Sequence, residues 1–339
     1  MTFVGGAGTP VAPTLAFGDD PSLDSPLRPA DNPTIGDRVF RAICVSAASV
    51  ALLIITATVI FLVNKARPSL AKTGAWGFFT GSVWVAGAGR FGVLGLLLGT
   101  IIIAIIALVA AVPFAVAMAL FINEYAPPRI GRIITAVVDL LAAVPSLLFG
   151  MWGFFAFKQH VLPVSRWISE HLVAIPFFRS SVPPGQENFA GSSFIAGLVV
   201  AIMIIPIITS VSRDVMARVP REQCEGALAL GGSRWAMIRD VILPYGKSGI
   251  VGATMLGFGR ALGETVAVAL ILQGIAYKVN PHILEHGAGS IASNIFVRFG
   301  EASQLELSAL VGSGLALMAL TFAVGLLARR VVSRTTRFS

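Results

Sequence analysis

Six apolar runs dominate the sequence, and each is about as long as a helix that crosses a lipid bilayer. A hydrocarbon core about 30 Å thick needs a helix of about 20 apolar residues. The runs cover residues 42–63, 91–121, 133–157, 194–211, 250–272 and 305–328. A water-soluble domain with this pattern would expose large apolar patches. The sequence therefore predicts an all-α, polytopic membrane protein with about six transmembrane helices.

Composition agrees with a membrane protein and disfavours nucleic-acid binding. Of the 339 residues, 55% are hydrophobic, and the mean hydropathy is +0.83. The net charge of +8 comes largely from Lys and Arg in the polar segments between the apolar runs. Such clustering is a signal of membrane topology. The two cysteines, Cys44 and Cys224, have no disulfide or metal-binding spacing.

The distribution of basic residues predicts the orientation in the plasma membrane. An even number of spans places both termini on the same side. The short loop with Arg129 and Arg132 and the basic C-terminal tail favour the cytoplasm for that side. The expected organisation is a disordered cytoplasmic extension (1–37), a membrane domain (38–330) that includes a cytoplasmic loop (212–249), and a basic cytoplasmic tail (331–339).

The loop at 212–249 is expected to contain two short helices joined by glycine. Arg221 to Leu230 can form a helix, and Gly231 can adopt the left-handed backbone that ends one. Ser233 is expected to cap the second helix, and Pro244 is expected to end it. These residues alone fit a cytoplasmic loop without a partner equally well.

Two opposite charges lie in the fifth apolar run. Arg260 and Glu264 are four residues apart, so a continuous helix would place them on one face, where they can neutralise each other. A lone charge in lipid is expensive. One interpretation is a structural ion pair. The other is an anion pathway, because a guanidinium is a planar, permanently charged fork that matches an oxyanion.

Two partial motifs do not predict sites. Gly246-Lys247-Ser248 resembles the end of a phosphate-binding loop, but Val241 stands where that loop needs glycine. Any ATP hydrolysis must therefore come from another chain. His282 and His286 match a zinc-protease spacing, but neighbouring Pro281 and Gly287 leave only about one helical turn. A polar external loop is the better interpretation there, and a membrane metalloprotease is a distant alternative.

The spacing in the cytoplasmic loop resembles the EAA loop of ABC importer permeases. Glu225-Gly226-Ala227 is followed after three residues by Gly231, and after nine more by Val241-Ile242-Leu243-Pro244. Gly226 and Val241 replace the usual Ala and Ile. The resemblance implies a type I ABC importer permease whose glycine turn sits in a cleft of the ATPase subunit. It assigns coupling to Glu225, Gly226, Ala227, Gly231, Leu243 and Pro244.

The charged run narrows the resemblance to the phosphate-specific branch, the PstC permeases. The segment Gly259 to Thr265, GRALGET, is similar to a helix of that branch, as are the segments 142–146, 150–153 and 202–206. The similarity covers about residues 40–330. It implies import of inorganic phosphate, with Arg260 and Glu264 linked to phosphate passage.

The same resemblance implies an assembly. Its members would be a homologous second permease (PstA-like), two ATPase subunits (PstB-like) and an external phosphate-binding protein (PstS-like). ATP and Mg would bind to the ATPase subunits, and this chain would bind no cofactor and have no catalytic residues. Two alternatives stay open: a permease for another oxyanion, such as sulfate or molybdate, and a stand-alone secondary transporter or channel, which would need no coupling loop.

Overall fold

The structure is a computed structural model that describes residues 34–182 and 188–335. Most of the expected disordered extension, residues 1–33, and residues 336–339 of the tail lie outside the described residues. The described part of the extension starts a helix. Thr34 and Asp37 cap it reciprocally, because each side chain accepts a hydrogen bond from the backbone N–H of the other.

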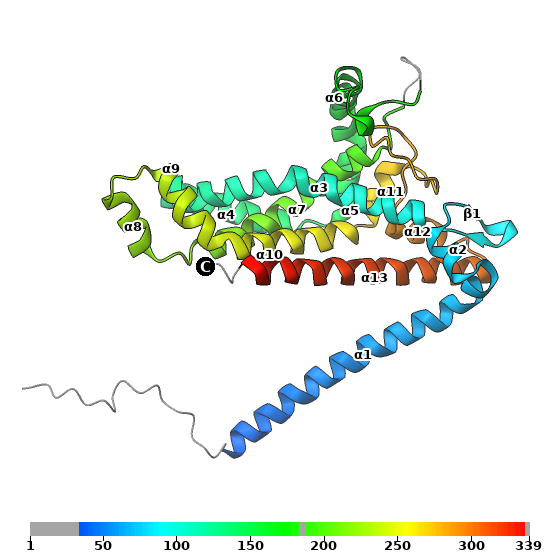
Figure 1. The fold of residues 1–339 in the computed structure, drawn as a ribbon, viewed down its shortest axis with the longest axis horizontal. Coiled ribbons are helices and arrows are strands. Elements are labelled where there is room, and N and C mark those ends of the chain that lie inside the picture. The colour runs from blue at the N-terminus through cyan, green and yellow to red at the C-terminus, as the bar shows by residue number, and fades with distance from the viewer. Residues whose placement is uncertain (1–33, 183–187, 336–339) are drawn as a thin grey trace, which may run out of the picture. The chain divides into compact units, whose positions relative to one another are not determined.

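The chain folds into helices and one short β-hairpin (Figure 1). The elements up to the middle of the chain are α1 (Ile35–Thr73), α2 (Ala75–Thr80), β1 (Trp84–Val85), η1 (Ala86–Ala88), β2 (Arg90–Phe91), α3 (Leu94–Leu120), η2 (Phe121–Tyr125), α4 (Pro128–Ala143), α5 (Ser146–Trp152), η3 (Gly153–Phe157), α6 (Lys158–His171) and η4 (Pro176–Phe178). The remaining elements are α7 (Ser193–Met216), α8 (Arg221–Ala229), α9 (Arg234–Met237), η5 (Ile238–Ile242), α10 (Leu243–Leu262), α11 (Val266–Leu272), α12 (Ile291–Arg298) and α13 (Gln304–Thr335).

The chain divides into two compact units, residues 1–57 and 58–339. In the first unit, the described residues form the N-terminal part of α1, whose apolar side chains are exposed, as contact with lipid requires. The second unit contains the helix bundle and the loops.

Helices α3, α7 and α10 form the centre of the bundle. They pack on one another, and α13 packs against α10 (Figure 1). The face of α3 toward the core carries a stripe of fully buried alanines: Ala104, Ala107, Ala111, Ala115 and Ala119. Small side chains let helix backbones approach closely, which is how helices gain contact energy in a bilayer. The Thr209 hydroxyl adds a hydrogen bond to the Ala115 carbonyl at 3.4 Å.

Two of the six expected spans are broken. In place of one helix over 133–157, α4 ends at Ala143, and the axis bends by 94° before the helical stretch Ser146–His171. Pro145 causes the break: it has no N–H to donate, and it forces Val144 into an extended conformation. The described residues therefore contain five helices long and apolar enough to span a membrane, or six with the bent pair.

The fifth span also differs from the expected 250–272. The helix begins at Arg234, runs through Pro244 and stops at Leu262, before a separate α11. Pro244 does not end it because a π-helical turn, Ile238–Ile242, comes immediately before α10. In that turn the Leu243 N–H reaches five residues back, to the Ile238 carbonyl, which accommodates the proline without stopping the helix.

The ends of the other spans are extended. Helix α1 continues past Val63 to Thr73 although it contains Pro68, and Ser69 N–H next to that proline donates to Ser308 Oγ on α13 at 3.1 Å. Helix α13 continues to Thr335, so the first five residues of the expected tail, 331–335, are helical. The Ser308 hydroxyl thus accepts a hydrogen bond from the Ser69 amide, which Pro68 disturbs. In a low-dielectric environment such an amide needs a partner within the protein.

The aromatic segment before α3 is partly buried. Phe78 and Trp84 lie in the core, whereas Trp76 is 82% exposed. Trp84 stacks on Tyr277 with ring centroids 5.5 Å apart, and its Nε1–H donates to Glu306 Oε1 at 3.1 Å. Only some of the aromatics are therefore free to lie at the lipid headgroups.

Trp84→Phe should destabilise this end of the bundle. The substitution keeps an aromatic six-membered ring but removes the indole N–H, so the buried Glu306 carboxylate loses its donor at a cost of about 1–3 kcal/mol. The lost part of the indole leaves a cavity that adds to this cost. We expect a lower midpoint of thermal denaturation for the detergent-purified protein. The matched control is Trp76→Phe, at an exposed tryptophan, which should leave the midpoint unchanged. Equal midpoints for both variants would contradict the role of the Trp84 hydrogen bond.

Candidate functional site

The loop between α7 and α10 has the predicted helix–glycine–helix form. Helix α8 ends at Ala229, and Gly231 adopts a φ of +84°, a conformation that glycine takes without steric cost. The Gly232 N–H returns to the Ala227 carbonyl at 3.1 Å and closes the turn. Ser233 Oγ accepts from the Ala236 N–H at 3.2 Å and caps α9, as predicted.

One side of this loop is anchored to the bundle. Met216, Val219, Met237, Ile238 and Ile242 form a buried cluster with Ala119. Ala227 and Leu243 pack on the cluster from α8 and α10. Two residues of the EAA pattern that lie far apart in the sequence therefore share one apolar support, which fixes the loop relative to the spans.

The opposite side of the loop is exposed. Glu225, Gly226 and Gly231 are all accessible, and Leu230 is 91% exposed. Trp235 at the start of α9 is 59% exposed. Two large apolar side chains on a polar loop are typical of a surface that another subunit covers. The sequence predicts Trp235 on one apolar face with Ile238 and Ile242, which are buried, and it indicates no role for Trp235 or Leu230. The signal that could have found both residues is their position directly beside the glycine turn.

Cys224 lies between the anchored and exposed sides of the loop. Partial burial raises the pKa of its thiol, and the negative charges of Glu124 and Glu225 raise it further. The thiolate fraction at neutral pH is correspondingly small, so this cysteine is a slow nucleophile.

Arg260 and Glu264 do not form the expected pair on one helix. Helix α10 stops at Leu262, and Gly263 separates it from the turn before α11. Within residues 34–182 and 188–335, no hydrogen bond or ion pair joins Arg260 to Glu264. The glycines at 259 and 263 weaken the helix, and the Glu264 carboxylate offers the backbone a competing partner.

Glu264 is buried, and it stabilises the start of α11. Its Oε1 accepts a hydrogen bond from the Ala267 N–H at 3.2 Å, three residues ahead, as an N-capping side chain does. It is 8% exposed. A free N–H at a helix start and a carboxylate are complementary, because the helix dipole is positive there.

Arg260 is exposed on the other side of the break. It lines a hollow of ≈ 540 Å³ with Gly259, Met255 and Leu256 of α10 and Ile207 of α7. The hollow is otherwise apolar, so the guanidinium is its only charged group among these lining residues. The arrangement offers an anion a fork of donors against apolar helix faces.

The two broken spans meet each other. The short segments after the breaks, α5 and α11, pack together, and a side chain at Gly150 would overlap the Cα of Ala267. Non-helical backbone at membrane depth is tolerated where it is buried in protein or lines a water-filled cavity. The breaks at Pro145 and Gly263 thus mark one region of the bundle, adjacent to Arg260.

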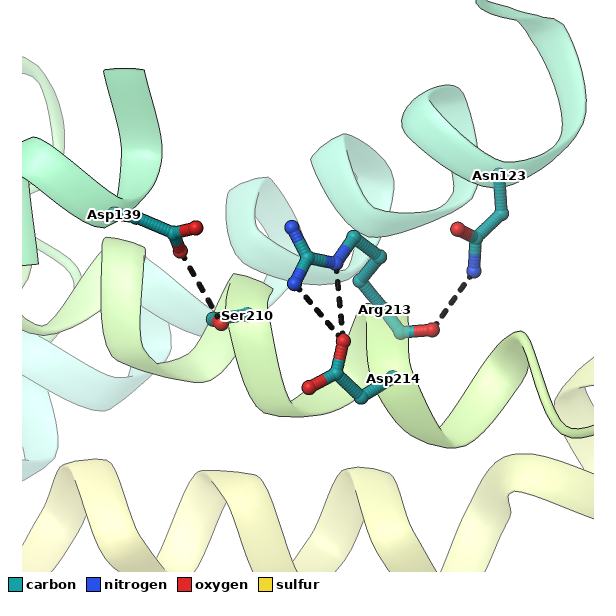
Figure 2. Close-up of polar contacts among 5 residues, drawn as sticks. All are labelled: Asn123, Asp139, Ser210, Arg213 and Asp214. Atoms are coloured by element: carbon teal, nitrogen blue, oxygen red, sulfur yellow. Dashed lines mark hydrogen bonds and ion pairs between the residues drawn. The ribbon is translucent and has the colours of Figure 1, made fainter. Parts of the chain in front are cut away.

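A second carboxylate, Asp139, lies on α4. Asp139 is exposed, and Ser210 Oγ of α7 donates to its Oδ1 at 3.5 Å (Figure 2). Further along α7, Arg213 binds Asp214 through Nε and Nη2 at 3.1 and 2.9 Å, and Asn123 donates to the Arg213 carbonyl at 2.9 Å. An acidic residue within an apolar run is the signal that could have selected Asp139.

The histidine motif lies in a non-helical segment that hydrogen bonds hold to other loops. The segment from His282 to His286 is not helical. Glu285 accepts hydrogen bonds from Ser180 and Ser181; burial alone would raise its pKa, but these bonds bring the pKa below its ordinary value. His286 Nδ1 contacts the Ala190 carbonyl at 2.7 Å. The motif thus ties the connector before α7 to the connector before α12.

Comparison with known proteins identifies the family. The model of binding-protein-dependent transport system inner membrane components matches residues 111–337. Phosphate transport system permease protein PstC 2 of Mycobacterium tuberculosis is 41% identical over 311 residues, which cover 90% of this chain and 93% of that protein. PstC of Haemophilus influenzae is 38% identical over 307 residues, covering 89% and 95%.

Among solved structures, an inward-facing form of the MetNI methionine ABC transporter matches with a TM-score of 0.47 and 16% identity, covering 72% of this chain and 94% of that one. The identification rests on the family match and the sequence relatives. The chain belongs to the binding-protein-dependent transport system inner membrane components and, within that family, to the PstC permeases.

Proposed function

We propose that this chain is the membrane-spanning permease subunit of an ATP-driven importer of inorganic phosphate. Its relatives over about 90% of its length are named as phosphate transport permeases. The observation that carries the proposal is Arg260, an exposed guanidinium at a break between two helices, in an apolar hollow. A permanently charged donor fork in apolar surroundings suits a tetrahedral oxyanion better than a neutral solute.

The exposed glycine turn is the surface through which ATP binding and hydrolysis in another subunit would act on this chain. The family places the chain in an ABC transporter with ATPase subunits. We propose that Gly231, Leu230 and Trp235 dock in a cleft of a PstB-like ATPase, with Glu225 and Gly226 at its edge. ATP and Mg bound by two such subunits would draw two coupling loops together.

The coupling movement reaches the anion site along one helix. Arg234 to Leu262 is a continuous helical stretch of 29 residues, about 42 Å long at 1.5 Å per residue. One end carries the docking surface, and the other ends beside Arg260 and the break at Gly263. Tilting this helix would therefore move Arg260 and the hollow that it lines. The helix would pivot near Leu243 and Pro244, where Leu243 packs on the buried cluster.

Half of the path is present in this chain. A PstA-like permease would supply the facing half, and a PstS-like external protein would deliver phosphate to it. We propose that Arg260 contacts the anion and that Glu264, which fixes the start of α11, lies beside the path and positions the break. The cytoplasmic side would carry the coupling loop and both termini.

The alternatives predict different behaviour. A permease for sulfate or molybdate would keep the coupling loop and change the anion that competes for uptake. A stand-alone transporter or channel would have no use for Leu230, 91% exposed beside a glycine turn. That exposed turn favours a subunit of a larger complex.

Gly231→Asp should uncouple the transporter. A residue with a Cβ at φ +84° strains the turn by about 1–2 kcal/mol, and the new charge would enter the ATPase cleft. We expect reduced co-purification of the ATPase and reduced phosphate-stimulated ATP hydrolysis, with normal membrane insertion. The control is Gly300→Asp in the connector before α13, the same chemical change at a glycine outside the left-handed region, where a Cβ meets nothing within 4 Å. Wild-type ATP hydrolysis in Gly231→Asp would refute the docking role.

Labelling of Cys224 tests both the orientation and the local electrostatics. An impermeant thiol reagent should label it in inside-out vesicles and not in intact cells. Removing one neighbouring charge in Glu225→Gln should lower the thiol pKa, so labelling at neutral pH becomes faster and the rise of the rate with pH shifts to lower pH. Labelling from outside intact cells would overturn the cytoplasmic placement.

Arg260 and Glu264 should behave differently when each is neutralised. Arg260→Gln removes the charge that holds the anion, and we expect phosphate uptake to fall at least about tenfold in complexes that still assemble. Glu264→Gln keeps an oxygen that can accept from the Ala267 N–H, so assembly should persist and uptake should fall less. Uptake measured in vesicles that contain matched amounts of assembled complex checks this. Unchanged uptake in Arg260→Gln would exclude a contact with the anion.

A further inference from the structure

Asp139 is a carboxylate in an apolar helix without a basic partner. It is the twelfth residue of α4, about 16 Å from the helix start at 1.5 Å per residue. The ion pairs found in the described parts of the chain are Arg213–Asp214 and Arg239–Asp240, and neither includes Asp139. Its contact with Ser210 is a long hydrogen bond of 3.5 Å, and the carboxylate is otherwise exposed.

The nearest basic residue on α7 is already engaged. Arg213 lies three residues beyond Ser210, but its guanidinium makes two hydrogen bonds to Asp214 (Figure 2). An unpaired carboxylate that faced lipid would be expensive, so such residues face a partner or a water-filled cavity. The geometry therefore points to an aqueous surface at Asp139 and Ser210.

This surface lies one helical turn along α7 from a residue that lines the hollow with Arg260. Ile207 of α7 lines that hollow, and Ser210 is one turn further along the same helix, about 4.5 Å toward the coupling loop. Along α7, an anion moving from the hollow toward the coupling loop would thus meet Arg260 first and then Ser210 with Asp139. The two helices that carry the opposite charges, α4 and α10, both pack on α7.

We propose that Asp139 and Ser210 form an acidic exit step for phosphate on the coupling-loop side of Arg260. The inference rests on the proposed function and adds a residue to its path. A guanidinium in an apolar hollow would retain a divalent anion, because electrostatic attraction is strong at low dielectric. The Asp139 carboxylate lowers the positive potential there. It can also accept a hydrogen bond from the P–OH group of protonated phosphate in place of the Ser210 hydroxyl.

The local charge can be measured without relying on transport. Cys44 and Cys224 are replaced by serine, and Ser210→Cys is introduced in the assembled transporter in vesicles. Its modification rate is compared for a trimethylammonium and a sulfonate thiosulfonate reagent of similar size. The ratio of the two rates reports the electrostatic potential and is independent of the thiol pKa, because both reagents attack the same thiolate.

We expect the cationic reagent to be favoured. Asp139→Asn should lower the cation-to-anion rate ratio by roughly three- to tenfold, as one charge within about 10 Å requires at intermediate dielectric. Asp139→Glu should restore it, and Arg260→Gln should raise it. The matched control is Asp240→Asn, the same chemical change on an exposed residue of the coupling loop, which should leave the ratio unchanged. Phosphate uptake at saturating phosphate should fall several-fold in Asp139→Asn and recover in Asp139→Glu.

Two results would overturn the proposal. In one, Ser210→Cys reacts with neither reagent in any nucleotide state, so the surface is not aqueous. In the other, Asp139→Asn leaves the rate ratio unchanged, even if uptake falls, which would make Asp139 a packing residue. Failure of the proposed function is a separate result: uptake would then be insensitive to Arg260→Gln whatever the rate ratio.

Discussion

The structure depends on the rule that a backbone amide or carbonyl in a bilayer must find its partner within the protein. Helices satisfy this rule automatically, so each departure from a helix needs a specific replacement. Ser308 accepts from the amide that follows Pro68, and Glu264 accepts from a free amide at the start of α11. At Pro244 the replacement is a π-helical turn in place of a side chain. At these three positions a neighbouring side chain or a changed backbone register provides the hydrogen bond that a regular helix would have made.

The helix breaks lie close together, in the region where we propose the anion path. Helical interruptions at Pro145 and Gly263 are joined through the packing of α5 on α11. Next to them lies the exposed Arg260, and one turn further along α7 Ser210 donates a hydrogen bond to the exposed Asp139 of α4. Rigid packing of alanines between α3 and α7 holds the rest of the bundle. A firm core beside a polar, irregular region is the arrangement that a solute path between two subunits requires.

Much of this could be predicted from the sequence, because the dominant signals are local. The apolar runs indicated most of the long helices, and Gly231 with Ser233 indicated the turn between α8 and α9. The pairing of Arg260 with Glu264 on one helix was wrong, since four-residue spacing assumes a continuous helix and two glycines with a capping carboxylate ended it. Asp139 could not be placed, because its neighbour Ser210 is 71 residues away in the sequence. Helix breaks and contacts between helices depend on tertiary structure, which periodicity does not report.

The exposure of Leu230 also bears on the life of the chain in the cell. Chaperones and proteases act on chains that expose apolar surface, and Leu230 stays nearly bare until a partner covers it. A subunit made in excess would show this side chain to the cytoplasm until an ATPase covered it. If Leu230 docks the ATPase as proposed, the abundance of the subunit should follow the supply of its partners, and an uncovered Leu230 would report to the cell that assembly is unfinished.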